Sequence, residues 1–379
     1  MTIAEESTAW PMVTGPIDKG GLDFSFKWNM GWMHDFCEYM KLDPYFRKNN
    51  HYSMTFAMSY NSAENYILPL SHDEVVHLKC SMVNKMPGLR ADKYANLRAG
   101  YAYMFGHEGK KLLFMGQEFG QEKEWNEKQS LSWELLEDKK HLQLKNYMAA
   151  LHAFYKANPA LYQLDEKPEG FEWINGMEWE KNLLIFLRRT RKKEDTLLVI
   201  CNFSNVEYDD FRIGVPYPGK YKEMFNSDAE SYGGTGVGNP RVKMSKKTEC
   251  DERKNSITVK LAPLSVQVFS YTKPETGAAS NKSAKAKTAA KAATEKKTGK
   301  KGKPAGKTER SSKKASKSEV KAKKTNKGTA SKSREKSREK GIGKNGEKPQ
   351  RKSRELRLRT EKVEKAVKQA IDSKTGRKR

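Results

Sequence analysis

The aromatic and methionine side chains of this chain are confined to one part of the sequence. Every Phe, Trp, Tyr and Met residue precedes Lys273. Residues 273–379 instead hold 38 of the 73 Lys and Arg residues and only 11 of the 47 Asp and Glu residues. A hydrophobic core needs large apolar side chains, and like charges repel one another, so a core can form only within residues 1–272. We therefore expect residues 273–379 to be a disordered, basic tail rich in Lys, Ala and Ser.

The remaining charges and the cysteines exclude several classes of protein. Residues 1–272 hold 35 basic and 36 acidic side chains, so this part is close to neutral although the whole chain carries +26. Its four cysteines are widely spaced and form no C-x-x-C pair, which argues against a disulfide framework and against a zinc site. The chain shows no signal-peptide pattern and no apolar stretch long enough to span a bilayer. We expect a cytoplasmic protein with reduced thiols, no metal, no cofactor and no membrane association.

The first 165 residues alternate short apolar runs with longer amphipathic runs. Thr2, Ile3 and Ala4 resemble the end of a buried strand. Further strands are expected over 22–28, 67–75 and 110–120, and helices over 31–42, 55–66, 91–109 and 141–161. Strands that alternate with helices are typical of right-handed parallel units. We count about four strands, whereas a closed barrel of such units has eight.

The periodicity changes between about Gly170 and Tyr271. Short runs rich in β-branched or aromatic residues follow one another and are separated by turn signals such as "YGGTGVGNP". The clearest of these runs lie at 182–189, 196–203, 220–225, 256–261 and 265–271. This pattern predicts an antiparallel all-β domain. We place the domain boundaries at 1–165 for the strand and helix part, 166–272 for the all-β domain and 273–379 for the tail.

Polar side chains follow three of the expected strands. Glu5 and Glu6 come directly after the first strand, residues 71–74 end another, and Gln117 and Glu118 follow a third. The carboxyl ends of parallel strands meet at one edge of the sheet, where α/β enzymes of this kind place their active sites. The sequence therefore predicts one shared site.

The segment "LPLSHDEVVH" points to the chemistry of that site. A carboxylate beside an imidazole can bind a hydroxyl-rich ligand, because Asp73 accepts hydrogen bonds from sugar hydroxyls while His72 donates one. The alternative is that both residues merely cap the following turn. A single strand-end carboxylate such as Glu5 is equally ambiguous. Together, however, carboxylates at neighbouring strand ends are what retaining glycosidic chemistry uses.

A family resemblance joins these segments. "TIAEEST", "GGLDFSFKWNMGWMHD", "LPLSHDEVVH", "NKMPG", "ANLRAGYAYM" and "KKLLFMGQEFGQ", in that order, resemble the second half of a bacterial glycogen branching enzyme of the alpha-amylase superfamily. "GFEWI", "VICNFS", "NSDAESYGG" and "LAPLSVQVFSY" resemble the β-sandwich that follows the barrel in that family. The resemblance implies an α/β fold: the second half, about four strands, of a (β/α)8 barrel, then an all-β sandwich domain and the basic tail.

The resemblance also implies roles for individual residues. The barrel acid of the family directly follows an alanine at a strand end, which corresponds to Glu5, and Glu6 is the less favoured neighbour. Asp73, with His72 beside it, corresponds to the residue that braces the transition state through sugar hydroxyls. Glu74 would line the same cleft. The implied reaction cleaves an α-1,4 glucan link and transfers the chain to a 6-hydroxyl with retention, so the expected partner is an α-glucan such as glycogen or amylose.

Other residues are candidates for binding the glucan. Trp10 and Trp125 could stack on glucose rings, although most barrel tryptophans are packing residues, and Trp28 is expected in the core. Glu118 is assigned to substrate binding and is the first alternative if another carboxylate must act in catalysis.

The sequence departs from the family pattern at two places. The family nucleophile is an aspartate of a D-G-x-R-x-D type strand, and residues 1–379 contain no such segment. Residue 1 thus corresponds to an internal position of the barrel, as in a split or frameshifted reading frame or a truncated gene model. We expect this chain to be inactive alone and to need a separate chain that supplies the other barrel half. The second departure is Leu78, where many relatives carry glycine.

The basic tail allows three interpretations. It is a solvated extension, an arm that binds nucleic acid or another polyanion, or a tether to an acidic protein. It has no aromatic side chain for stacking on bases, so any nucleic-acid binding should be nonspecific. The hypotheses for the whole chain are therefore a portion of a branching enzyme, a non-catalytic glucan-binding remnant, or a polyanion-binding protein that acts through its tail.

The tail hypothesis predicts salt-dependent DNA binding. If the tail neutralises phosphates and releases counterions, the logarithm of the affinity should fall with the logarithm of the salt concentration, with a slope of about 0.9 per phosphate. The affinity should hardly depend on DNA sequence. Filter binding of the full chain and of a 1–272 truncation across a salt series measures this, and equal binding by both would remove the tail from the explanation.

Overall fold

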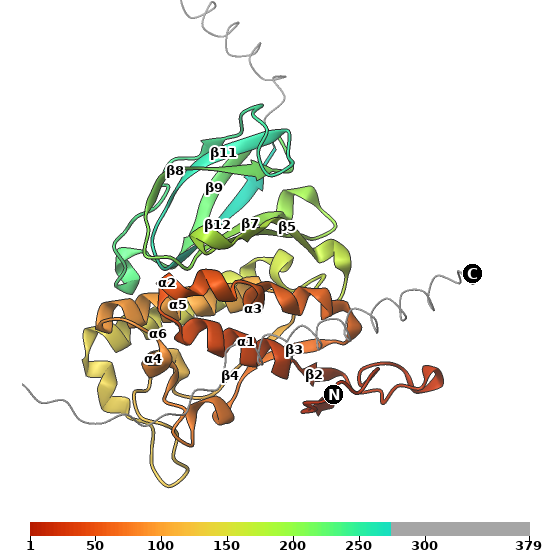
Figure 1. Cartoon of the computed structure of the whole chain (residues 1–379), viewed down its shortest axis with the longest axis vertical. Coiled ribbons are helices and arrows are strands. Elements are labelled where there is room, and N and C mark those ends of the chain that lie inside the picture. The colour runs from red at the N-terminus through yellow and green to blue at the C-terminus, as the bar shows by residue number, and fades with distance from the viewer. Residues whose placement is uncertain (274–379) are drawn as a thin grey trace, which may run out of the picture. The chain divides into compact units, whose positions relative to one another are not determined.

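The computed structural model describes residues 1–273 (Figure 1). The tail expected to be disordered, residues 273–379, lies outside the described residues except for Lys273. The principal helices are α1 (Met30–Lys41), α2 (Pro44–Arg47), α3 (Tyr52–Thr55), α4 (Met82–Lys85), α5 (Arg90–Gly106) and α6 (Lys139–Ala157). The strands are β1 (Ile3–Ala4), β2 (Phe26–Trp28), β3 (Tyr66–Leu70), β4 (Lys110–Leu113), β5 (Phe171–Glu178), β6 (Leu183–Arg188), β7 (Leu197–Asn202), β8 (Tyr208–Val215), β9 (Lys220–Asn226), β10 (Lys243–Met244), β11 (Asn255–Leu261) and β12 (Ser265–Thr272).

Strands β1 to β4 form the parallel sheet that the sequence predicts. Their order is β1-β2-β3-β4, and each neighbouring pair is parallel. The strands are shorter than the apolar runs suggest, because the polar residues after β3 and the glycine-containing segment after β4 turn into 3-10 helices, η5 (His72–Val75) and η6 (Gln117–Phe119). Since all four strands run in one direction, their carboxyl ends lie along one edge of the sheet.

The helices largely follow the expected pattern. Helix α1 begins at the Asn29 cap, whose Oδ1 accepts a hydrogen bond from the Trp32 N–H. The single helix expected over 55–66 is wrong in detail. The structure divides this segment into the end of α3 and two 3-10 turns, η3 (Phe56–Ser59) and η4 (Asn61–Ala63), because the backbone at Tyr60 leaves the helical region.

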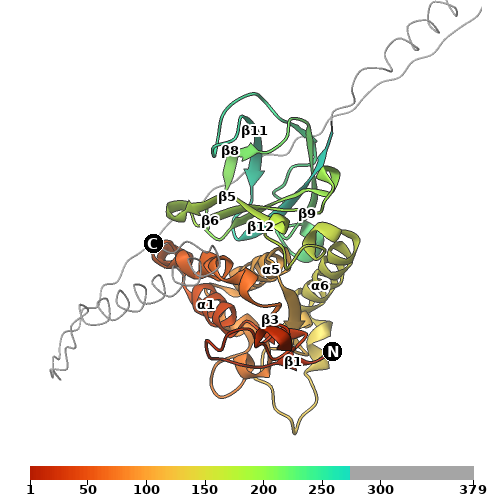
Figure 2. The same cartoon turned by 90° about the vertical axis from the view of Figure 1, so that its right-hand side faces the viewer.

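The second half of the described chain is the predicted antiparallel all-β module (Figure 2). A six-stranded sheet of order β10-β9-β12-β7-β6-β5 faces the pair β11-β8 across a core rich in Ile, Leu and Val. All five predicted runs contain strands. Strands β5, β8 and β10 lie outside these runs. In β8 the charged residues near its start face solvent and only its last three residues are buried, so no apolar run marks it. Both parts lie in one compact unit, so the boundary at 165/166 remains a prediction.

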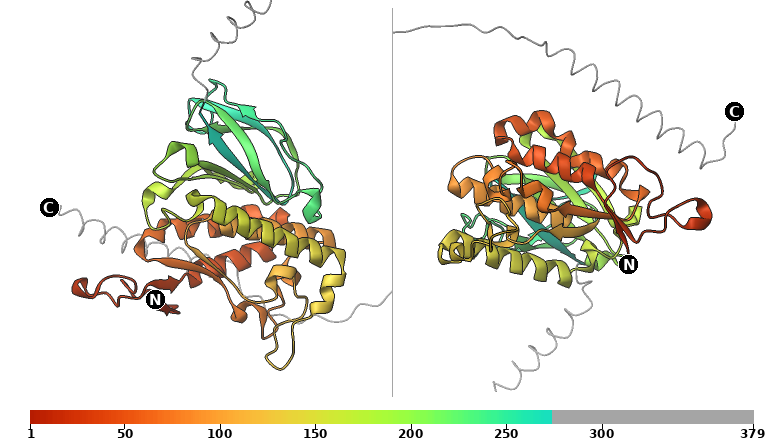
Figure 3. Two further views of the ribbon diagram at one scale, coloured as in Figure 1. Left: turned by 180° about the vertical axis from the view of Figure 1, so that it is seen from behind. Right: turned by 90° about the horizontal axis from the view of Figure 1, so that it is seen from below.

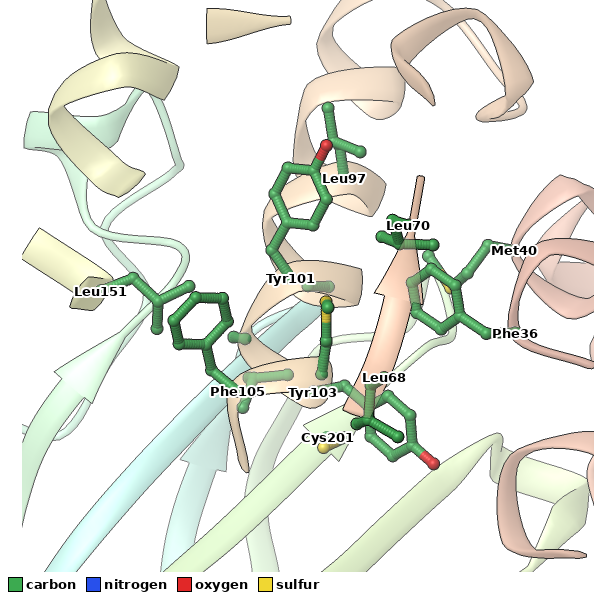
Figure 4. Packing of buried hydrophobic residues seen from close by; sticks show 14 of the residues in the cluster. Phe36, Met40, Leu68, Leu70, Leu97, Tyr101, Tyr103, Phe105, Leu151 and Cys201 are labelled. Atoms are coloured by element: carbon green, nitrogen blue, oxygen red, sulfur yellow. The ribbon is translucent and has the colours of Figure 1, made fainter. Parts of the chain in front are cut away.

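Helix α5 packs against both parts. Figure 3 shows how the helices of the first part and the green strands of the all-β part lie against one another. Every residue from Asn96 to Gly106 is buried. Figure 4 shows side chains of α5 such as Tyr101 and Phe105 among residues of α1, β3, α6 and β7. At the end of the helix, a Cβ built on Gly106 would lie 3.3 Å from Val199 of β7, which is tighter than ordinary contact. A larger residue here would require Val199 to shift by a few tenths of an ångström, so glycine suits this close approach of α5 to the all-β part.

Two buried guanidinium groups join the strand and helix part (1–165, called the barrel half) to the all-β domain (166–272, called the β-domain). Arg47 donates hydrogen bonds to the Phe203 carbonyl (2.9 Å) and to Asn96 Oδ1 (2.7 Å), and burial lowers its pKa to about 10. Arg188 on β6 donates to the Gly106 carbonyl (2.8 Å) and pairs with Asp165 at 2.6 Å.

Arg188 also controls the ionisation of its partner. Burial alone would raise the pKa of Asp165, but Arg188, helped by Lys111 and Lys110, holds it below its usual value. Asp165 is therefore a buried carboxylate that depends on a buried cation.

Replacing that cation should destabilise the whole unit. Arg188→Met leaves Asp165 charged and without its main partner, so we expect a loss of about 3–5 kcal/mol in the free energy of unfolding. Urea unfolding followed by tryptophan fluorescence and by circular dichroism measures it. Arg191→Met, at an exposed position three residues later, is the control and should change stability by less than about 0.5 kcal/mol. Equal effects of the two substitutions would contradict this account.

Candidate active site at the carboxyl edge of the parallel sheet

Glu5 and Glu6 follow β1 but are held differently. Glu6 accepts hydrogen bonds from the Thr8 N–H (2.8 Å) and from Lys27 Nζ (2.9 Å). The Thr8 hydroxyl, Lys27 and the Thr8 N–H, in that order, lower the pKa of Glu6 to about 2. Lys27 is a buried residue of β2 and also donates to the carbonyl oxygens of Thr8 and Trp10. Within the described part of the chain, the exposed carboxylate of Glu5 has no hydrogen-bond or ion-pair partner. Glu6 thus anchors the segment after β1, whereas Glu5 is available to a ligand.

In the segment after β3, too, some side chains stabilise the turn while others remain accessible. Ser71 Oγ accepts from the Asp73 N–H (3.3 Å), and the Glu74 carboxylate accepts from the Ser71 N–H (2.5 Å), which forms a capping box around η5. Glu74 is buried, so its carboxylate stabilises the turn. His72 and Asp73 are about half exposed, and His72 Nε2 lies 3.4 Å from Asp73 Oδ1. The alternative that His72 and Asp73 cap the turn through their side chains does not describe this geometry.

An aromatic cluster supports His72. Its ring lies 5.9 Å from Phe114 and 5.7 Å from Trp125, and these two rings meet edge to face at 5.2 Å. The backbone N–H of Trp125 also donates to the Val75 carbonyl (2.9 Å). Trp125 lies in the connection between β4 and α6, so residues distant in the sequence fix the imidazole. Sequence reasoning left the role of Trp125 open because nothing in its local pattern marks it.

The structure places the other candidates apart from this cluster. Glu118 lies in η6 after β4, and its Oε2 accepts from the Gly116 N–H (2.7 Å). Trp10 lies in the connection from β1 to β2 with 58% of its surface exposed. Each therefore stays at or near the carboxyl edge, and their contact with substrate remains a prediction.

Glu5 and Asp73 share one edge of the sheet without touching. Their strands β1 and β3 both pair in parallel with β2, so the two backbones are about 10 Å apart. The end of β2 between them is occupied by the Asn29 cap, whose Oδ1 also accepts from the Tyr60 hydroxyl (3.0 Å). The edge therefore offers two carboxylates and an imidazole to a ligand.

The loop after η5 is held in an unusual backbone conformation. His77, Leu78 and Cys80 have positive φ angles of 55°, 65° and 65°. Glu124 stabilises the loop, because its carboxylate accepts from the N–H groups of Leu78 (3.1 Å) and Cys80 (2.6 Å). This explains why glycine suits position 78, and Glu124 is a residue that sequence reasoning missed.

The described residues show neither a metal-binding cluster nor a membrane-spanning helix. Among residues 1–273, no group of three or more His, Cys, Asp or Glu side chains is arranged to hold a metal ion. In the same range, no helix combines the length and apolar character needed to cross a bilayer.

The all-β domain matches a known protein family. Residues 173–272 match the model of the alpha amylase C-terminal all-beta domain. A solved α-amylase from H. orenii aligns with 71% of this chain and 53% of its own, with a TM-score of 0.44 and 16% identity. The all-β domain that the sequence predicts is thus similar to the C-terminal domain of α-amylases.

The more specific resemblance is to branching enzymes. A 1,4-alpha-glucan branching enzyme GlgB of Butyrivibrio fibrisolvens is 56% identical over 276 residues, which are 73% of this chain and 43% of that protein. The GlgB of Rubrobacter xylanophilus is 49% identical over 273 residues, 72% of this chain and 38% of that protein. The predicted resemblance to bacterial branching enzymes is thus confirmed, and the chain spans less than half the length of these relatives.

The strained loop generates a stability prediction. Leu78 has a left-handed backbone, which costs a non-glycine residue about 1–2 kcal/mol, and its side chain is 94% exposed. Leu78→Gly should therefore stabilise the protein by about 1 kcal/mol and raise the melting temperature by about 2–4 °C. Lys79→Gly is the control and should not raise it, because Lys79 does not have a positive φ. Differential scanning calorimetry compares them, and a lower melting temperature for Leu78→Gly would contradict the explanation.

Proposed function

We propose that residues 1–272 supply the acid and one side of the glucan site of a 1,4-alpha-glucan branching enzyme. The observation that carries the proposal is the division of labour along the carboxyl edge. Glu6 and Glu74 are engaged in an ion pair and a cap, while Glu5 and Asp73 present their carboxylates at the ends of β1 and β3. The identity to branching enzymes supports the particular reaction.

In the proposed reaction Glu5 is the general acid and base. Protonated Glu5 gives its proton to the 4-oxygen as the α-1,4 bond breaks and a nucleophilic carboxylate bonds to the anomeric carbon. Glu5 then takes the proton of an incoming 6-hydroxyl, whose oxygen attacks the same carbon and releases the nucleophile. Two inversions give retention, and an α-1,6 link forms. Glu6 is less suited to this role, because Lys27 and the Thr8 N–H already hold its carboxylate.

Asp73 and His72 are proposed to bind the hydroxyls of the sugar at the reacting bond. The aromatic cluster holds the imidazole while leaving about half of both side chains accessible. Trp10 and Glu118 would contact glucan further along the edge, and Glu74 would act through the cap that positions Asp73.

The nucleophile is proposed to come from a segment outside residues 1–379. This chain contains no D-G-x-R-x-D type strand. The outer edge of β1 has no strand partner among the described residues, and it is the edge that such a segment would pair with. The isolated chain should therefore show no branching activity, and a partner fragment should restore it. The alternative, a non-catalytic remnant that only binds glucan, predicts no activity even with the partner.

Co-expression with the amino-terminal part of a branching enzyme tests the proposal. The fragment should end just before the segment that corresponds to "TIAEEST". Branching of amylose is read from the iodine spectrum and from α-1,6 signals in NMR spectra. Glu5→Gln should lower the activity of the restored pair by about 100-fold to 10,000-fold, the usual contribution of a general acid, and Asp73→Asn should lower it as well.

Glu6→Gln is the matched control, because it changes the neighbouring carboxylate in the same way. It should retain activity within about ten-fold while loosening the segment after β1. If Glu6→Gln abolishes branching and Glu5→Gln does not, the assignment of the acid is wrong. If the unpaired chain branches amylose, a carboxylate within residues 1–379 is the nucleophile, and Glu118 is the first to replace.

A further inference from the structure

A small cavity lies beside η5, between the segment after β3 and the segment after β4. Its volume is about 10 Å³. Its wall is mostly apolar and includes Val75 of η5, Met82 of α4, and Trp125 and Leu131 from the connection between β4 and α6. The few polar side chains on this wall therefore decide what the cavity can bind.

Two buried polar atoms on the wall have no hydrogen-bond partner within residues 1–273. One is the hydroxyl of Ser81, a residue that is 2% exposed. The other is Oε1 of Gln117, which is 4% exposed. Buried polar atoms in folded proteins are paired with another protein group or with an ordered water molecule. Both atoms therefore need a partner that the described side chains do not supply.

The amide of Gln117 is fixed in orientation. Its Nε2 donates a hydrogen bond to the Leu70 carbonyl at the end of β3 (3.1 Å). The flipped orientation would place Oε1 against that carbonyl, so two acceptors would face each other. Oε1 is therefore the atom of Gln117 that remains for the cavity, and it can only accept a hydrogen bond.

Size and polarity together select the occupant. The volume is close to the about 10–15 Å³ that one water molecule needs, so a larger molecule does not fit. A buried water molecule makes about three hydrogen bonds. Besides Ser81 and Gln117, the wall contains Gln121, whose Oε1 accepts from the Ser132 N–H (2.9 Å), which leaves its Nε2 to donate.

We propose that one water molecule is bound in this cavity and joins Ser81 to Gln117. The water donates a hydrogen bond to Gln117 Oε1, accepts one from the Ser81 hydroxyl and accepts another from Gln121 Nε2. Gln117 then holds both ends of the intervening loop, Leu70 directly through Nε2 and Ser81 through the water. The water site thus clamps residues 71–80, which include His72 and Asp73. The inference goes beyond the proposed function and does not depend on it.

The backbone of the clamped loop explains why such a restraint is needed. His77, Leu78 and Cys80 have positive φ angles, and such conformations persist only where the surroundings enforce them. Glu124 holds the N–H groups of Leu78 and Cys80. The water would add a second restraint at the next residue, Ser81.

Magnetic relaxation dispersion of the water signal tests the site in a solution of the full chain, because it counts water molecules that stay bound while the protein rotates. Ser81→Val removes the hydroxyl and fills the space, and Gln117→Met removes the acceptor at nearly constant length. Each should lower the count of long-lived waters by about one. The double variant should also lower it by about one, because both atoms hold the same molecule. An unchanged count in either single variant, or a loss of about two in the double variant, overturns the proposal.

Ser265→Ala is the matched control. Ser265 is 1% exposed, but its Oγ donates to the Ala262 carbonyl (2.8 Å). Loss of this hydroxyl removes a hydrogen bond within the protein and should leave the water count unchanged, even where the melting temperature falls as far as in Ser81→Val. A lower count in this control would mean that any loosening releases a water, and it would overturn the assignment to the cavity.

A crystal structure of the parent chain tests the site without any variant. One electron-density peak should lie within about 3.2 Å of both Ser81 Oγ and Gln117 Oε1. A well-defined structure without that peak overturns the proposal.

Amide hydrogen exchange tests the clamp itself. In Ser81→Ala, which removes the hydroxyl without filling the cavity, the Leu78 and Cys80 amides should exchange about two-fold to ten-fold faster, as expected for the loss of one hydrogen bond. In Ser265→Ala these amides should exchange as in the parent. Unchanged exchange in Ser81→Ala would overturn the role of the water in holding the loop.

Discussion

The burial of helix α5 on all sides is the constraint on which the other parts depend. A helix that is buried around its whole circumference needs packing partners on every face. The parallel sheet and α1 cover one side, and strands of the β-domain cover another, at a distance that Gly106 permits. Side chains of the β-domain therefore belong to the same hydrophobic core as those of the barrel half. The buried cations Arg47 and Arg188 add direction to this contact, because each must meet particular carbonyl and carboxylate groups.

The parallel pairing of β1, β2 and β3 brings the residues of the candidate site together. Because β1, β2 and β3 run in one direction, three strand ends bring polar residues to one edge, and each end must also satisfy its own backbone. At the end of β2, Asn29 performs this task through its Oδ1, which also accepts from the Tyr60 hydroxyl. At the other two ends the task falls to Glu6 and Glu74, which leaves Glu5 and the pair of His72 and Asp73 accessible. Structural and chemical roles are thus divided between adjacent residues.

At the opposite end of the sheet, the contact between the barrel half and the β-domain leaves polar atoms without partners among the described residues instead of forming a site of accessible carboxylates. Where the loops before β3 and β4 meet β5, Asn61 Oδ1 and Glu108 Oε1 are buried and have no hydrogen-bond partner within residues 1–273. A junction that served packing alone would more readily use apolar side chains there, since each unpaired buried acceptor is costly. The contact between barrel half and β-domain therefore leaves a cavity of about 240 Å³ beside polar atoms that packing alone does not explain.

The sequence by itself determined most of the element types, because apolar periodicity and turn residues are local, although it missed β8 and the break in the segment 55–66. It determined the site candidates too, because Glu5 and Asp73 directly follow apolar strand runs. It also indicated the family. Tertiary structure decided which carboxylates are accessible, since Glu6 depends on Lys27 and Glu74 on the cap around Ser71. It likewise decided the place of Trp125, the Glu124 loop and the Glu108 cavity. These rest on contacts between segments far apart in the chain, and such contacts leave no periodic trace in the sequence.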